Sequence, residues 1–180
     1  MKNNLVILIF ALIFCFLSNT VVADQFFGGL LLNPVSGQPN FEADGILNGG
    51  IGYETERFGL TNWRFSYTMT NFRLNDDSSV KIKSNILAAE TLFVAKIRSG
   101  LSLIGAIGPA LFQTAVESGD SFTSIDIGLS ATGSLRFALS NSLFLSAAFH
   151  YKNCAVSGSG SDQVVDGGYQ GLMLEVGTFF

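Results

Sequence analysis

Charged side chains are scarce in this chain of 180 residues. It has ten Lys and Arg, 14 Asp and Glu and a single His, which gives a formal net charge of −4. Proteins that bind DNA or RNA neutralise phosphates with a basic surface. The acidic balance therefore argues against nucleic acid as a partner.

Long apolar runs are absent except at the amino terminus. There, residues 5–17 (LVILIFALIFCFL) follow Lys2 and precede the small-residue site Val21-Val22-Ala23. This order is typical of a secretory signal peptide cleaved before Asp24, and the run is shorter than the about 20 residues of a membrane-spanning helix. We expect a signal peptide at residues 1–23 and one domain at residues 24–180, which keeps nine bases and 14 acids.

Cysteine is equally rare, because only Cys154 remains once Cys15 is removed with the signal peptide. A lone cysteine excludes an internal disulfide. We favour an unpaired residue at a strand end, with an intermolecular bridge or a reactive thiol as alternatives. His150 and Cys154 would lie roughly 13 Å apart along a strand, too far to share a metal ion. The sequence thus predicts no metal site, and nothing in it calls for a cofactor.

The sequence is rich instead in alternating apolar and polar residues, a period of two that indicates β-strands. Eight such segments follow Ala23, at residues 25–33, 44–53, 58–69, within 80–95, 101–112, 124–137, 143–153 and 168–180. The connections at 34–43, 70–79, 113–121 and 154–167 are long, and those at 54–57, 96–100 and 138–142 are short. An even strand number with long loops at one end and short turns at the other is typical of outer-membrane barrels.

Alternation alone does not say which face is inside, and a soluble lipocalin-like barrel also has eight strands. In residues 58–69 and 124–137 the polar set is small or charged, which suits a narrow lumen. The bulky set includes aromatic residues near the expected strand ends, which suit a lipid surface with aromatic girdles. These are Trp63, Phe65, Tyr67, Phe149 and Tyr151. We predict an all-β, eight-stranded, antiparallel up-and-down transmembrane β-barrel with its apolar side chains outward.

The end of the chain carries a family resemblance. The pattern LFLSAAFHYKN, a loop, and GYQGLMLEVGTFF ending on Phe180 resembles the small eight-stranded outer-membrane barrels of Gram-negative bacteria, the OmpA/OmpX type. The resemblance implies a place in the bacterial outer membrane, contact with its lipid and lipopolysaccharide, and assembly by the outer-membrane insertion machinery. By the same resemblance the last strand would be the insertion signal, through Leu172, Leu174, Val176 and Phe180.

The predicted faces turn seven titratable side chains toward the lumen. They are Arg64, Glu90, Asp126, Arg136, His150, Lys152 and Glu175. One interpretation is a charged pore or gate. The other, which we favour, is a structural network of ion pairs, because eight strands leave room for side chains but little for water and buried charges need partners.

One segment raises the alternative of an enzyme. His150-Tyr151-Lys152-Asn153 is similar to the His-x-Ser-Asn segment of the lipid A 3-O-deacylase barrels, with His150 and Asn153 matched and Lys152 in place of the serine nucleophile. A hydroxyl nucleophile needs an adjacent base and an orienting group. We therefore favour a non-enzymatic envelope-structural or surface-interaction role. The four long loops are the candidate ligand-binding segments, and lipid A modification is the alternative.

Overall fold

The computed structural model describes residues 24–38, 40–44, 48–55, 62–77, 79–117, 122–156 and 167–180. The expected signal peptide, residues 1–23, lies outside this part. The described residues form nine strands: β1 (Gln25–Ser36), β2 (Phe41–Ala43), β3 (Gly49–Thr55), β4 (Asn62–Leu74), β5 (Lys81–Arg98), β6 (Leu101–Glu117), β7 (Phe122–Ala138), β8 (Leu143–Val156) and β9 (Tyr169–Phe179). Among these residues there is no helix with the length and hydropathy needed to cross a membrane.

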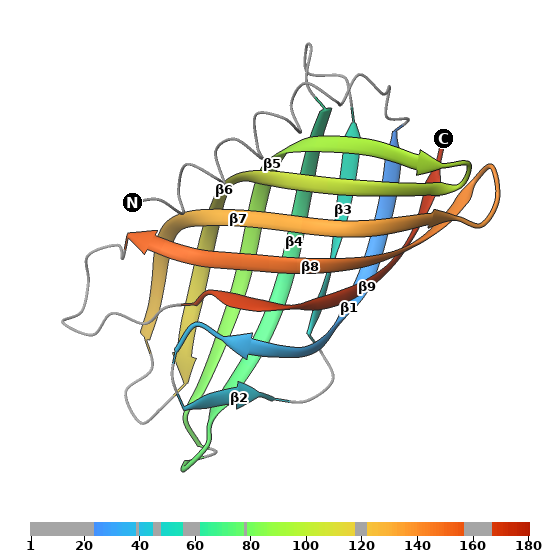
Figure 1. Cartoon of the computed structure of the whole chain (residues 1–180). Helices are drawn as coiled ribbons and strands as arrows, with labels where there is room; N and C mark the ends of the chain where they lie inside the picture. The colour runs from blue at the N-terminus through green and yellow to red at the C-terminus, as the bar shows by residue number, and fades with distance from the viewer. Residues whose placement is uncertain are drawn as a thin grey trace, which may run out of the picture.

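Eight of the strands close into an antiparallel up-and-down barrel, which confirms the predicted fold class. The order around the wall is β1, β3, β4, β5, β6, β7, β8 and β9, and β9 pairs back onto β1 (Figure 1). The short turns after β5 and β7 lie at the same end of the barrel as the carboxy-terminus (Figure 1). We call this the turn end and the opposite one the loop end.

The ninth strand, β2, continues the wall where β3 stops. It pairs with residues 72–74 of β4, whereas β3 pairs with residues 63–69 of the same strand. The prediction of one continuous loop at residues 34–43 is therefore wrong, because 34–36 belong to β1 and 41–43 to β2. Pro34 fits within β1 since the register against β9 shifts between Leu32 and Val35, and a bulge tolerates the missing N–H of proline.

The strands also reach further toward the loop end than predicted. β4 includes residues 70–74, β6 includes 113–117 and β8 includes 154–156, all of which were expected in loops. In two of these extensions an outward charged residue pairs across strands, Glu117 of β6 with Lys83 at 2.5 Å and Arg73 of β4 with Glu42 at 2.8 Å. On β4 and β6 the backbone ladder continues past the last bulky apolar side chain of the outer face, so the end of the outward apolar alternation does not mark the end of the strand.

The two faces of the wall are chemically distinct. On β4, Phe65, Tyr67 and Met69 are exposed on the outside, while Arg64 and Ser66 are buried in the lumen. The same division holds on β7, where Ile125, Ile127, Leu129, Leu135 and Phe137 are exposed and Asp126, Ser130, Thr132, Ser134 and Arg136 are buried. The apolar set therefore faces outward.

The lumen is filled in three layers. Toward the loop end a cluster of mostly large apolar side chains occupies it, with Phe72, Ile82, Ile86, Phe112, Tyr169 and Met173 among its members. A smaller apolar cluster near the turn end consists of Leu92, Val94, Ile104 and Ala106. A polar layer of buried charged side chains adjoins both clusters, since Glu90 follows Ala88 of the first cluster and precedes Leu92 of the second along β5. The barrel interior is thus largely filled with side chains, as expected for eight strands.

Candidate functional site: a buried charge cluster in the lumen

Arg64 is the centre of the polar layer. It projects inward from β4 between β3 and β5, and in the ladder it lies opposite Glu54 on one side and Glu90 on the other. Its Nη1 is 3.1 Å from Glu54 Oε1, its Nε is 3.6 Å from Glu90 Oε2, and its Nη2 donates to Glu175 Oε1. All four side chains are fully buried. One guanidinium therefore joins carboxylates from β3, β5 and β9.

Glu54 connects this centre to a second arginine. Arg136 on β7 donates from Nη1 and Nη2 to the two oxygens of Glu54, both at 2.8 Å. Such two-point pairing fixes the orientation of both groups. Each guanidinium also stacks on an aromatic ring, Arg64 at 4.1 Å from the ring centre of Phe27 and Arg136 at 4.2 Å from that of Phe144. Stacking of this kind favours a buried cation.

The third cation comes from β8. Lys152 donates from Nζ to the hydroxyls of Ser66 and Thr68, at 3.3 and 3.1 Å. On the same strand, His150 Nε2 lies 3.3 Å from Glu175 Oε1. The carboxylates Glu54, Glu90 and Glu175 are thus equal in number to the cations Arg64, Arg136 and Lys152, without counting His150. A closed balance matters because an uncompensated buried charge is strongly destabilising.

The structure brings together six of the seven residues proposed from the sequence. Arg64, Glu90, Arg136, His150, Lys152 and Glu175 all lie in this polar layer. Asp126 is also buried, but it accepts from Ser124 of its own strand, at 2.8 Å. Glu54 also belongs to this layer, although residues 54–57 were predicted to form a short turn. The sequence does contain a signal for this position. Glu54 comes two residues after Gly52, so it lies on the same, inward face of β3.

The two residues matched to the deacylase segment lie on opposite faces of β8. His150 is buried in the lumen, whereas Asn153 is outside, where its amide donates to the Tyr151 hydroxyl at 3.0 Å. They do not share a site. In the described part of the chain no group of three or more His, Cys, Asp or Glu residues is arranged to hold a metal ion. Cys154 is half-buried on β8, opposite Gly128.

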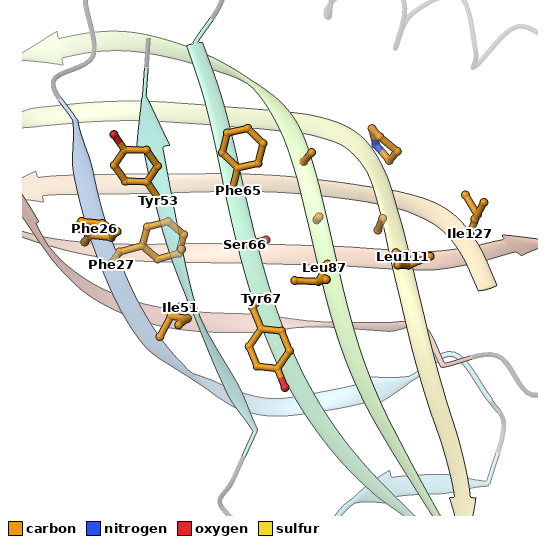
Figure 2. Close-up of a pocket in the computed structure, with 15 residues that line it drawn as sticks. Phe26, Phe27, Ile51, Tyr53, Phe65, Ser66, Tyr67, Leu87, Leu111 and Ile127 are labelled. Atoms are coloured by element: carbon orange, nitrogen blue, oxygen red, sulfur yellow. The ribbon is translucent and has the colours of Figure 1, made fainter. Parts of the chain in front are cut away.

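The outer wall carries an apolar groove of about 820 Å³. Figure 2 shows aromatic side chains of β1, β3 and β4 on one side of it, and Leu87, Leu111 and Ile127 on the other. The aromatic residues are Phe26, Phe27, Tyr53, Phe65 and Tyr67. Small residues such as Ala89 lie between the two sides. A hollow lined almost entirely by carbon on an exposed wall fits an apolar surrounding better than water.

The residues of the expected insertion signal lie at the seam of the barrel. Leu172, Leu174 and Val176 are exposed on the outside of β9, and Phe180 follows that strand. The Phe180 amide donates to the Asp24 carbonyl at 3.0 Å, and its ring centre lies 5.2 Å from that of Phe26. The last residue of the chain is thus held against the start of β1.

The loop end carries exposed ion pairs. Lys81 pairs with Asp44 at 2.8 Å, in addition to the two pairs on the strand extensions. The hydrogen bond from Lys81 holds the pKa of the Asp44 carboxyl below its usual range. Hydrogen bonds from the Ser79 hydroxyl and amide lower the pKa of Asp77 in the same way. Both acids are therefore charged at neutral pH.

No protein-family model matches the sequence, and no characterised protein matches it at the level of sequence. Solved structures do match its fold. Neisserial surface protein A superposes with a TM-score of 0.63 at 18% identity, over 87% of this chain and 96% of that one. Ail of Yersinia pestis, in complex with the heparin analogue sucrose octasulfate, gives 0.56 at 16% identity, over 88% and 97%.

A third similar structure is the N-terminal β-barrel domain of OprF from Pseudomonas aeruginosa, with a TM-score of 0.52 at 13% identity, over 89% of this chain and all of that domain. At these identities the likeness concerns the fold. It agrees with the closure of eight strands described above.

Proposed function

We propose that this chain, which has the fold of the small eight-stranded outer-membrane barrels, is an exported barrel of the bacterial outer membrane with a sealed lumen and a surface-interaction role at its loop end. One observation carries the proposal: the wall is apolar outside while the lumen is filled with packed and paired side chains. A soluble barrel would have the reverse arrangement. The groove in Figure 2 then contacts the acyl chains of outer-membrane lipid and lipopolysaccharide.

Export and insertion belong to the same proposal. A signal peptide at residues 1–23 would deliver the chain across the inner membrane and leave Asp24 as its first residue. The hydrogen bond from the Phe180 amide to the Asp24 carbonyl ties these two residues together beside the β1–β9 seam. The outward residues of β9, Leu172, Leu174 and Val176, together with Phe180, would be recognised by the insertion machinery before the barrel closes.

A sealed lumen predicts the absence of ion conduction. The purified barrel in planar bilayers is expected to give no single-channel steps, because the apolar loop-end cluster and the neutral charge cluster leave no continuous polar path. The measurement is single-channel recording, with a porin as the positive control. Stable steps whose conductance scales with salt concentration would contradict the proposal and restore the pore interpretation.

The partner at the loop end is expected to be basic. Segments 34–43, 70–79, 113–121 and 154–167 contain one base, Arg73, against seven acids: Glu42, Asp76, Asp77, Glu117, Asp120, Asp162 and Asp166. Of the described bases near this end, Arg73, Lys81 and Lys83 each pair with an acid. This balance is the opposite of what a sulfated polyanion needs, such as the one in the Ail complex.

This charge balance can be tested by comparing the binding of a polycation with that of a polyanion. In phosphatidylcholine nanodiscs the barrel is expected to bind polylysine and not heparin, with an affinity that falls as salt screens the charges. The double variant Asp76→Asn/Asp77→Asn should weaken polylysine binding several-fold, because it removes two acids that lie outside the three ion pairs. Asp24→Asn at the turn end is the control and should have little effect. Tighter binding of heparin than of polylysine would overturn the assignment.

A further inference from the structure

The turn end of the lumen opens into a cavity of about 510 Å³. Val94 and Ile104, both buried, lie at its inner end, and Arg136 lines its wall. Lys96, Arg98 and the hydroxyl-bearing Ser99 and Ser102 also line it. No Asp or Glu is among its lining residues in the described part of the chain. In a chain with more acids than bases, the charged residues that line this cavity in the described part are therefore all cations.

The charges of these three bases are not equivalent. Arg136 is neutralised by its two-point pairing with Glu54. Lys96 and Arg98 are exposed, and neither is within ion-pair distance of a carboxylate in the described ranges. At the loop end, by contrast, each of the bases Arg73, Lys81 and Lys83 has an acidic partner. Among the described residues, the cavity thus carries two positive charges that no acid pairs with.

The β5–β6 hairpin places both charges at the mouth of the cavity. Lys96 lies opposite Ser102 and Arg98 opposite Leu101, with a register shift between the two pairs. Ile97 between them is exposed on the outside of the wall. The turn that follows is tight because Gly100 adopts a φ of 76°, which glycine accepts without strain. The hairpin therefore holds Lys96 and Arg98 at the rim of the lumen on a rigid support.

We propose that this turn-end cavity binds a phosphate group, either as inorganic phosphate or on a small organic phosphate. Two uncompensated cations match the double negative charge of a phosphate, whereas a carboxylate would leave one of them unpaired. The Ser99 and Ser102 hydroxyls add neutral donors. The cavity is closed on its inner side by apolar residues, which strengthens the attraction between the charges. The placement of this cavity in the periplasm rests on the proposed function, whereas the phosphate site itself does not.

Inorganic phosphate is the probe. Isothermal titration calorimetry of the barrel in zwitterionic detergent, at low salt and pH 7.5, is expected to show saturable binding at one site. The double variant Lys96→Gln/Arg98→Gln should weaken that binding by about tenfold or more, because it removes two charge-assisted contacts. The variant residues are exposed at a turn, so circular dichroism and heat-modifiable migration should remain those of the folded barrel.

The matched control is Lys81→Gln/Lys83→Gln, which removes the same charge at the loop end and should leave phosphate binding unchanged. Equal weakening by both variants would show that phosphate follows only the overall field of the molecule, and would overturn the site. Competition by acetate at the same concentration as phosphate would overturn the choice of a doubly charged ligand. Absence of saturable phosphate binding to the unmodified barrel would overturn the proposed site. That result would not affect the proposal that the barrel lies in a membrane.

Discussion

Replacing Arg64 by alanine is expected to lower the free energy of unfolding by about 3–5 kcal/mol, the cost of removing one partner from a buried ion pair. The change leaves Glu90 and Glu175 facing each other in the lumen without the cation that joins them. Glu54 retains Arg136. Reversible urea unfolding in lipid vesicles, followed by tryptophan fluorescence, measures the difference.

Two variants show whether charge is the cause. Arg73→Ala removes an exposed arginine from its pair with Glu42 and should cost only about 0–1 kcal/mol. Adding Glu175→Gln to Arg64→Ala should recover part of the loss, since one of the stranded carboxylates becomes neutral. If Arg64→Ala is no more harmful than Arg73→Ala, the charge cluster contributes little to the stability of the barrel.

Replacing Leu174 by arginine is expected to destabilise the barrel by about 2–4 kcal/mol, the cost of placing arginine near the middle of the bilayer on the lipid-facing side. Leu174 is exposed on the outside of β9 and lies between Leu30 of β1 and Ala147 of β8. The same urea titration in vesicles measures the effect.

Thr178→Arg is the matched control, with the same new side chain on the same strand and face but at the turn end. It should cost about 0–1 kcal/mol, as for arginine near the interface. A wall that faces water would tolerate both substitutions alike. Equal and small effects would therefore contradict the membrane orientation, whatever the stability of the charge cluster.

The fold could be predicted from the sequence because a period of two is a local property. On β4 and β7 the alternation of bulky apolar with small or charged residues fixed both the strands and the face that each residue joins. The ends of the strands could not be predicted in this way. Apolar alternation stops where polar pairs such as Lys83 with Glu117 take over, while the backbone ladder continues.

The candidate site was predictable only in part, for a related reason. The alternation of side chains along each strand predicts that Asp126 and Glu175 face the lumen. It does not predict how far along the barrel axis each of them lies. Height depends on the tilt and stagger of the strands, which no single segment contains. Glu54 was missed because its neighbours resemble a turn, and its role becomes visible only when β3 is paired in register with Arg64. The apolar layer around Phe72 and Phe112 lies where the sequence analysis placed loops or strand ends.

The seam joins the first strand, β1, to the last, β9, with Gln25 opposite Phe179 and Ser36 opposite Tyr169. Contacts so distant in sequence form late and slowly. Before the eleven residues of β9 pair with β1, the sheet has two unpaired edges and an exposed apolar face. Such a sheet is prone to aggregate. If the chain crosses the periplasm as proposed, its transit has to be chaperoned. A chain truncated before β9 cannot close into this barrel.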